Sequence, residues 1–565
     1  MQIDAITLEV FWNRLVSIVN EQAAALVRAS FTTIVRETED LSSGIFDPAG
    51  NMLVQATTGT PGHINSMATG VKYFLKKYPP SALNPGDALV TNDPWLVSGH
   101  KRDLTVVSPI FFGGRLVALA ANTCHVADIG GRGFCADATT VFEEGLHIPI
   151  VKLFDRGEPV RPVFEFIESN VRVPHLVVGD TMAQISANEV SGRKLIEFLK
   201  EVGLPDLEAL AREILTRSEQ ATRRAIEAVP DGSASRELFV DGFEAPLKIQ
   251  VTVTIKGSDI YVDYAGTSPQ CSRGINVVFN YTHAYTTYAL KCAICPDVPN
   301  NDGSFRPIHV VAPAGCLLNA TYPAPVAGRH LIGHFAGPAI FGALAEILPD
   351  RVVADSSSLC ISQFDGETDA GERFVNNYFC TGGMGARPTK DGLSTTGFPT
   401  NISNSPVEVT ENVSPIFFVR KELICDSGGP GRFRGGLAQR VGFRIRSARP
   451  AAFNAMFERT KFPALGFRGG GNGRLAEVTV PTTGERPHPK SQYTLQPGHE
   501  VQVDTSGGGG FFPPFERDPL RVLEDVLDGL VSVERAAADY GVAIDRERLE
   551  IDWPRTRALR GQSGS

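Results

Sequence analysis

The sequence predicts an α+β fold of several domains, mixed α/β in organisation, with β-rich middle and C-terminal parts. At 565 residues the chain exceeds one ordinary core, so about three domains are expected. Helical apolar periodicity marks the start of the chain, alternation follows in the middle, and residues 420–515 combine glycine with short strands. This grouping predicts closely packed domains at 1–230, 231–420 and 421–565.

The N-terminal part begins with a predicted long helix, because apolar residues recur with a helical period from Asp4 to Ser30. Turn residues in RETEDLSSGIFDPAGNML (36–53) then predict a loop and a short hairpin. Residues 181–228 have the pattern of two helices, which Gly203 and Pro205 interrupt.

Strand patterns dominate farther along, with helices between them. Apolar and polar residues alternate from 237 to 262, most clearly in LKIQVTVTIKGSDIYV. Helices are expected near 281–293 and 338–348, and a final helical pattern runs from Val522 to Tyr540. The polar end of the chain, RTRALRGQSGS, is expected to be frayed.

Charge and composition exclude several classes of protein. The net charge is −9 and no basic run stands out, which argues against nucleic acid or an anionic membrane as a partner. The most apolar stretch, 335–345, is far shorter than the roughly 20 residues of a membrane span. The N-terminus lacks a signal-peptide pattern, and nine scattered cysteines are typical of reduced thiols. A cytoplasmic location is therefore expected.

A predicted hairpin gathers polar side chains at its open end. The apolar runs 104–112 and 116–121 are joined through Gly113-Gly114, a strong signal for two antiparallel strands. The polar residues beside the outer ends of these strands are His100, Asp103, His125 and Asp128. Because a hairpin brings its open ends together, residues that are 25 positions apart are expected to meet.

The regular register of this hairpin would not form a site. With a two-residue turn, Asp103 faces Cys124, and His125 points to the opposite face of the sheet. An irregularity between residues 104 and 124 would correct this, and we expect a bulge at Gly113-Gly114 or at Pro109. The alternative is that Asp103 or His125 lies just outside the ladder, where twist frees its direction.

The side chains at the open end suit a catalytic metal. His100, Asp103 and His125 supply two imidazoles and a carboxylate, a donor set for Zn²⁺, Mn²⁺ or Fe²⁺ with coordination positions left open. Ordinary polar residues at strand ends are the alternative. Other acidic residues could contribute to the site or only shape loops, namely Glu37, Glu39, Asp40 and Asp93.

Three glycine-rich segments resemble phosphate-binding loops only superficially. They are SGGPGRFRGGLAQRVGF (427–443), GFRGGGNGR (466–474) and TSGGGGFFPPFERDP (505–519). None ends in the Lys-Ser/Thr pair of a P-loop, and none has dinucleotide-fingerprint spacing between a strand and a helix. We interpret them as turns that let strands approach closely, with no nucleotide site on this chain.

Long stretches resemble the hydantoinase B/oxoprolinase family, which includes N-methylhydantoinase, 5-oxoprolinase, caprolactamase and the acetone and acetophenone carboxylases. They include ITLEVFWNRLVSIVNEQAAALVRASFTTIVRETED, GDALVTNDPWLVSGHKRDLTVVSPIF, DSGGPGRFRGGL and TSGGGGFFPPFERDPLRVLEDVLDGLVSVERAAADYGV. The resemblance implies a hydantoinase B-like fold and a metal held by His100, Asp103 and His125, which match a family pattern of His-x-x-Asp and a later His. It also suggests Asp40 as a fourth ligand.

The resemblance further implies a subunit of an ATP-dependent enzyme. An A-type partner would bind ATP and Mg²⁺, and this chain would carry a divalent transition metal, with zinc expected first and manganese or iron as alternatives. A cytoplasmic hetero-oligomer, such as a heterotetramer, would then hydrolyse a hydantoin or lactam. The alternatives are carboxylation of a ketone with bicarbonate, and a non-catalytic scaffold for the ATPase. The length of the chain favours the hydrolase.

Overall fold

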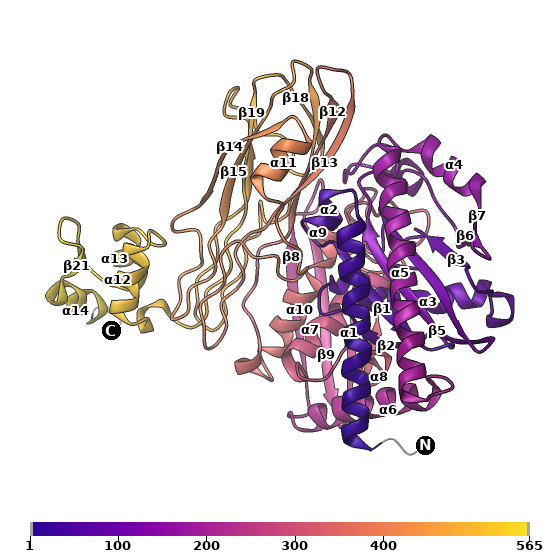
Figure 1. Cartoon of the computed structure of the whole chain (residues 1–565). Coiled ribbons are helices and arrows are strands. Elements are labelled where there is room, and N and C mark those ends of the chain that lie inside the picture. The colour runs from indigo at the N-terminus through magenta and orange to yellow at the C-terminus, as the bar shows by residue number, and fades with distance from the viewer. Residues whose placement is uncertain (1–3, 562–565) are drawn as a thin grey trace.

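A computed structural model of the protein describes residues 4–561 and shows an α+β molecule built from several sheets (Figure 1). The helices are α1 (Ala5–Ala29), α2 (Thr33–Arg36), α3 (Pro61–Lys77), α4 (Arg161–Asn170), α5 (Pro174–Val202), α6 (Glu208–Glu227), α7 (Phe279–Ile294), α8 (Asp302–Phe305), α9 (His330–Gly333), α10 (Ala336–Leu344), α11 (Val407–Val413), α12 (Pro519–Leu527), α13 (Val533–Tyr540) and α14 (Trp553–Gly561). The helices expected at 4–30, 281–293 and 338–348 are confirmed within a few residues. The two helices expected in 181–228 are α5 and α6, and α5 begins earlier than expected, at Pro174.

The N-terminal sheet has seven strands in the order β2-β1-β5-β4-β3-β6-β7. They are β1 (Leu41–Phe46), β2 (Met52–Gln55), β3 (Ala88–Thr91), β4 (Asp103–Phe112), β5 (Arg115–His125), β6 (Val151–Asp155) and β7 (Glu158–Pro159). Ala118 and Ala120 of β5 pack with α1 and α5, whereas Leu119 and Ala121 pack with α3 on the other face. Because both faces are covered, β4 and β5 are apolar almost throughout.

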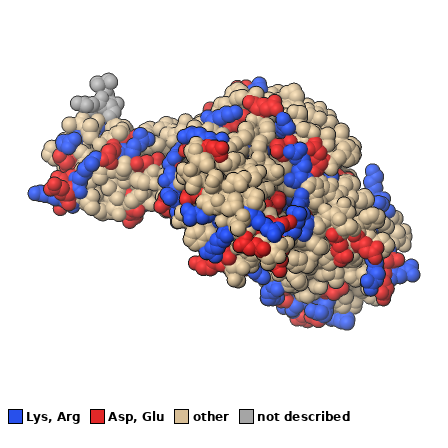
Figure 2. Space-filling view, turned by 90° about the horizontal axis from the view of Figure 1, so that it is seen from above, with Lys and Arg blue, Asp and Glu red and all other residues tan. Residues whose placement is uncertain are grey.

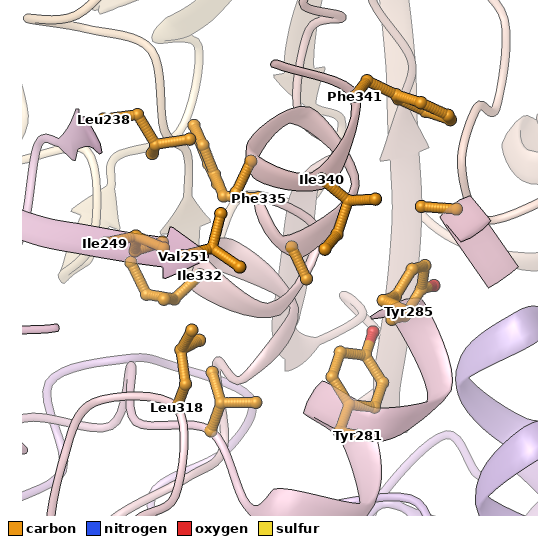
Figure 3. Packing of buried hydrophobic residues seen from close by; sticks show 14 of the residues in the cluster. Leu238, Ile249, Val251, Tyr281, Tyr285, Leu318, Ile332, Phe335, Ile340 and Phe341 are labelled. Carbon is orange, nitrogen blue, oxygen red and sulfur yellow. The ribbon is translucent and has the colours of Figure 1, made fainter. Parts of the chain in front are cut away.

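The second sheet has the order β11-β10-β9-β8, with β8 (Gly232–Val240), β9 (Leu247–Lys256), β10 (Asp259–Asp263) and β11 (Ile308–Val311). The strands predicted by alternation within 237–262 are thus confirmed. Helix α10 is buried throughout and packs on β8 and β9. Figure 3 shows Ile340 of α10 in the same core as Val251 and Ile249 of β9. Tyr281 and Tyr285 of α7 close the same core (Figure 3) and also reach the functional cavity described below.

Two further sheets form a sandwich around an aromatic core. One is β13-β12-β16-β18 and the other is β14-β15-β19-β17. The strands are β12 (Cys360–Glu367), β13 (Arg373–Cys380), β14 (Ile416–Leu423), β15 (Gln439–Ile445), β16 (Ala451–Met456), β17 (Glu477–Thr479), β18 (Gln492–Leu495) and β19 (Glu500–Asp504). Phe443 of one sheet contacts Phe364 and Tyr378 of the other, with ring centroids 5.2 and 5.3 Å apart. Such face-to-face packing of two sheets is typical of a β-sandwich.

The sandwich changes the expected division of the chain. A boundary at residue 420 falls inside β14, and it separates β12 and β13 from β16, which pairs directly with β12. No local sequence pattern shows that strands from distant parts of the chain will pair. The change in composition near residue 420 therefore marks the glycine-rich segments and not the start of the sandwich.

The C-terminal end forms a small unit at the opposite side of the molecule from the N-terminal sheet (Figure 1). The single helical pattern predicted from Val522 to Tyr540 is two helices, α12 and α13, which a turn with positive φ at Gly529 separates. The frayed end was also predicted wrongly, because Trp553–Gly561 forms α14 after the strands β20 (Ile544–Asp545) and β21 (Glu550–Ile551). Residues 562–565 of the predicted tail lie outside the described range.

The glycine clusters pack against one another beside the sandwich. A Cβ on Gly436 would lie 2.0 Å from the carbonyl oxygen of Leu393, and one on Gly435 would lie 2.0 Å from that of Gly508. A Cβ on Gly473 would lie 2.3 Å from the carbonyl oxygen of Gly507. The backbones approach so closely that no side chain fits between them, which agrees with the close-packing interpretation.

Charged side chains of both signs lie on the surface, and the helices are those of a globular fold. On the face shown in Figure 2, acidic and basic side chains are interspersed, and no single sign dominates. Within residues 4–561, no helix combines the length and apolar character that crossing a bilayer requires.

Candidate metal centre

The predicted hairpin forms and contains the predicted irregularity. Asp103, the first residue of β4, pairs directly with His125, the last residue of β5. Gly113 and Gly114 make a two-residue turn with φ of 56° and 78°, and Pro109 pairs regularly with Leu119. The register shifts between Ile110 and Phe111, so the bulge is confirmed within 104–124, but it lies at neither expected position. This shift places Asp103 and His125 on the same face.

His100, Asp103 and His125 meet at the open end of the hairpin. His100 Nε2 lies 2.7 Å and His125 Nδ1 lies 3.1 Å from the same oxygen, Asp103 Oδ1. One ligand atom from each residue lies within 4.8 Å of the other two, and all three residues are buried. In a tetrahedral zinc site each ligand atom lies about 2.0–2.1 Å from the ion. The ligand atoms are then separated from one another by distances similar to those between the three side chains here. Two imidazoles and a carboxylate therefore fit a divalent transition metal.

The orientation of His100 favours metal binding. Its Nδ1 lies 3.0 Å from the carbonyl oxygen of Ala327, which can only accept a hydrogen bond, so Nδ1 carries the proton. Nε2 then presents a lone pair toward Asp103, and it has no hydrogen-bond partner in the described part of the chain. A ring nitrogen held by a backbone carbonyl while the other faces the site is the usual arrangement of a ligating histidine.

Electrostatics keep His100 and Asp103 in the protonation states that a metal requires. Burial and the nearby Arg329 lower the pKa of His100 to about 3, so the imidazole is neutral. Burial alone would raise the pKa of Asp103, but His63 and Arg329 hold it well below its ordinary value. A neutral imidazole and an ionised carboxylate are the metal-binding forms of these side chains.

Two further residues hold Asp103 and were not predicted from the sequence. His63, in the first turn of α3, places Nε2 3.0 Å from Asp103 Oδ2. Arg329 places Nη2 2.5 Å from the same oxygen, and its guanidinium carbon lies 4.1 Å from the centroid of the Tyr281 ring. Its Nε donates to the carbonyl oxygen of Ser98, close to His100 in the chain. Arg329 thus fixes one oxygen of Asp103 and leaves the other to the two histidines.

Asp40, the suggested fourth ligand, lies in the same cavity as the three residues. Its backbone oxygen accepts from the amide of His125, and its Oδ1 lies 3.8 Å from His63 Nε2. The other acidic residues do not join the cluster. Glu37 contacts Arg36, and Glu39 accepts from Thr58. Asp93 accepts from the amide of Trp95, which is the turn-shaping role considered for it.

The cluster lines a small buried cavity of ≈ 30 Å³, enough for about one to two water molecules. The cavity lies where the three larger units meet, because its walls come from the N-terminal sheet, from α7 and α9, and from β12 and β13. Its lining residues are Asp40, Thr60, His63, His100, His125, Phe134, Tyr281, Tyr285, Arg329, His330, His334, Leu359, Ile361, Phe379, Thr400 and Ile402. Five of the 11 histidines of the chain face this one space.

Glu144 supports the wall that holds His100. Its Oε1 accepts from the amides of Val326 and Ala327, at 2.6 and 2.8 Å, and Ala327 in turn accepts from His100. Burial raises the pKa of Glu144 to about 8, although these two hydrogen bonds and Lys101 lower it. The folded protein therefore binds a proton here more tightly than the unfolded chain does.

This proton linkage predicts a loss of stability with rising pH. The stabilising contribution is complete below the ordinary pKa of glutamate, about 4.5, and disappears as the pH rises toward 8. Glu144→Gln keeps the acceptor oxygen but cannot ionise. In the wild type, the free energy of unfolding should fall by about 2–4 kcal/mol between pH 5 and 8 because of Glu144, since each pKa unit corresponds to ~1.4 kcal/mol. The variant should lack this part of the decrease. Urea unfolding at pH 5 and at pH 8 measures the free energy of unfolding of both proteins. If the decrease between the two pH values were the same in the variant as in the wild type, the prediction would be contradicted.

Comparison with known proteins agrees with the fold and identifies the family. A model of hydantoinase B/oxoprolinase proteins matches residues 4–514, nearly the whole chain. The chain belongs to the hydantoinase B/oxoprolinase family. The resemblance seen in the sequence is thus confirmed, and the match ends just before the small C-terminal unit.

Relatives within the hydantoinase B/oxoprolinase family include components of several enzymes. The B component of a putative D-/L-hydantoinase from a Pseudomonas species is 31% identical, over 99% of this chain and 98% of the relative. The caprolactamase beta chain of Pseudomonas jessenii is 30% identical over 99% of both chains. The crystal structure of the ATP-dependent caprolactamase of that organism has a TM-score of 0.90 at 28% identity and covers 99% of this chain and 100% of its own.

An acetone carboxylase structure shares the fold at greater distance. Its nucleotide-free form has a TM-score of 0.87 at 19% identity, covering 99% of this chain and 83% of the carboxylase chain. At this identity the likeness concerns the fold alone. The similarity of the chain to the hydantoinase and caprolactamase components is closer in sequence and extends over nearly the full length of both proteins compared.

Proposed function

We propose that this chain is the metal-binding catalytic subunit of an ATP-dependent cyclic amide hydrolase, which opens a hydantoin or lactam ring. The observation that carries the proposal is the buried cluster of His100, Asp103 and His125 in a cavity of its own. The similarity to hydantoinase and caprolactamase components supports the substrate class. Zinc is the expected ion, with manganese and iron as alternatives.

The residues of the cavity have distinct roles in this proposal. His100, Asp103 and His125 would hold the ion, and Asp40 is a further carboxylate in the lining of the cavity. A bound divalent ion supplies Lewis acidity, which lowers the pKa of water and polarises a carbonyl. Apolar side chains on the opposite walls, including Leu359, Ile361 and Phe379, keep bulk water out and strengthen electrostatic interactions. A lactam ring is larger than the cavity, so the units around it must separate slightly to admit one.

Activation of the amide is assigned to a partner. A lactam is an unactivated amide, and ATP can activate it through phosphorylation of the amide oxygen or through carboxyphosphate. The glycine clusters of this chain pack on each other and lack phosphate-binding spacing. We therefore propose that an A-type subunit binds ATP and Mg²⁺ and that the two subunits form a cytoplasmic hetero-oligomer. An activated intermediate would pass between them without meeting bulk water.

The test uses the chain alone and with its A-type partner. Elemental analysis should find about one transition metal ion per chain. The isolated chain should neither hydrolyse ATP nor open a ring, whereas the complex should turn over hydantoin, 5-oxoproline or caprolactam only with ATP. Active complex without zinc, manganese, iron or cobalt would overturn the metal assignment. ATP hydrolysis by the pure single chain would overturn the division of labour.

Ketone carboxylation is the second candidate, supported by the shared fold with acetone carboxylase. The same cavity could stabilise an enolate instead of an attacked amide. Acetone and acetophenone with bicarbonate therefore belong in the substrate panel. Turnover of a ketone without turnover of any ring would replace the hydrolase assignment with this one.

A further inference from the structure

His330 is the least satisfied polar side chain in the cavity. The residue is 3% exposed, yet neither Nδ1 nor Nε2 has a hydrogen-bond partner among residues 4–561. Its neighbour His334 differs, because His334 Nε2 lies 3.0 Å from the hydroxyl of Tyr281. A buried imidazole with two unpaired nitrogens is costly, so such a group in a native protein usually has a partner that binds there.

The backbone around His330 is fixed relative to the metal-binding residues. Ala327 accepts from His100, and Arg329 contacts Asp103, so two residues within three positions of His330 hold the cluster directly. The ring of Phe134 is close to both groups. Its centroid is 5.9 Å from that of His330, 5.6 Å from His100 and 5.1 Å from His125. His330 and the two candidate histidine ligands therefore share one aromatic neighbour.

His330 does not belong to the ligand group itself. Among the residues that the structure describes, the group whose ligand atoms lie within 4.8 Å of one another consists of His100, Asp103 and His125. His330 lines the same cavity as these residues. A molecule beside the cluster would thus contact His330 without displacing a ligand.

We propose that His330 is a catalytic residue that donates an N–H hydrogen bond to the reacting carbonyl oxygen of the substrate. The inference rests on the proposed function, and the ligand class is a small cyclic amide or, for the alternative reaction, a ketone. When the carbonyl carbon is attacked, negative charge develops on this oxygen, and a preplaced donor stabilises that charge. No covalent bond to His330 forms, and its proton stays on the ring.

A neutral imidazole suits this position. Burial, together with the positive charge of Arg329, holds the pKa of His330 well below its ordinary value. The ring therefore keeps one N–H donor without carrying a positive charge, which would repel a metal ion a short distance away. A neutral histidine can act as the electrophile toward a carbonyl in this way.

Two variants separate donation of a hydrogen bond from a packing role. His330→Phe keeps a ring of similar size but removes both nitrogens, and His330→Gln restores an N–H donor. The matched control is His283→Phe, since His283 Nδ1 is also buried without a partner in the described range, but the residue does not line the cavity. Each variant is assayed as the complete two-subunit enzyme with ATP, on hydantoin, 5-oxoproline, caprolactam, and acetone with bicarbonate.

We expect His330→Phe to lower kcat by roughly 10²–10³-fold, as loss of one such donor does elsewhere. Its metal content and thermal midpoint should not fall, because no ligand and no existing hydrogen bond is lost. His330→Gln should recover at least about tenfold of the lost rate, and His283→Phe should stay near the wild-type rate.

Three outcomes would overturn the proposal. They are a His330→Phe enzyme with near wild-type kcat, loss of metal in that variant, and a His330→Gln enzyme no faster than His330→Phe. Failure of the proposed function gives a different result, because the wild-type complex would then convert none of the three rings and no acetone, although all variants keep their metal.

Discussion

Replacing Asp103 with asparagine is expected to remove the bound metal and to lower turnover by at least ~10²-fold, the loss that follows removal of a single electrostatic contact at a reacting centre. The carboxylate lies within 3.1 Å of three imidazoles and a guanidinium, and it is fully buried. Asparagine keeps the shape but not the charge. Arg329 would remain as an unpaired buried cation, which costs about 3–5 kcal/mol of folding stability.

Asp128→Asn is the matched control for this variant. Asp128 is also fully buried just beyond β5, but its carboxylate contacts Arg172 at 2.8 Å and Arg102 at 3.5 Å, and no ion pair joins it to an imidazole within residues 4–561. The control should lose a similar amount of stability and keep both metal and activity. Elemental analysis, urea unfolding and turnover compare the two variants. An Asp103→Asn protein with a full complement of metal would disprove the role of Asp103 as a ligand.

The part of the site that the sequence could predict lies within one hairpin. His100, Asp103 and His125 are joined by two strands and a turn, so the pattern of apolar residues brings them together. Alternation also showed that the register had to shift. The place of the shift, between Ile110 and Phe111, could not be predicted, because a bulge away from the turn requires neither glycine nor proline.

The rest of the site depends on packing between units. His63, Phe134 and Arg329 come from α3, a loop and the start of α9, and no local pattern relates these segments to the hairpin. One signal was present, since His330 and His334 are spaced four residues apart in GRHLIGHF, a spacing that places two side chains on one face of a helix. Without the fold, this pair could not be related to the metal cluster.

The glycine clusters show the reverse case, in which the sequence predicted the role but not the partners. Close packing was the expected interpretation, and the structure shows backbones in direct contact. Gly508 illustrates why. Its amide donates to the carbonyl oxygen of Gly436, and its own carbonyl accepts from the amide of Gly429. Two segments far apart in sequence, 427–443 and 505–519, thus share hydrogen bonds at a distance that only glycine allows.

Gly508→Ala is therefore expected to destabilise the protein severely. The added Cβ would lie 2.1 Å from the carbonyl oxygen and 2.4 Å from the carbonyl carbon of Met384, both backbone atoms that no rotamer change can move. The segments must separate by about 1 Å to reach an ordinary C···O contact of roughly 3.3 Å. Because Gly508 is also hydrogen bonded to Gly436 and Gly429, this separation should strain those bonds, and the cost should exceed the ~1–3 kcal/mol that is typical of overpacking.

Gly337→Ala provides the matched comparison. Gly337 lies in α10, and a Cβ there would meet nothing within 4 Å. Alanine should stabilise the helix by about 0.5–1 kcal/mol, because it restricts the unfolded chain more than glycine does. Urea unfolding of both variants measures the difference. If Gly508→Ala lowered the free energy of unfolding by less than about 1 kcal/mol, the segments could separate at a cost below that of ordinary overpacking. The clusters would then be loops that tolerate side chains, and their glycine content would need another explanation, such as the binding of a ligand against the bare backbone.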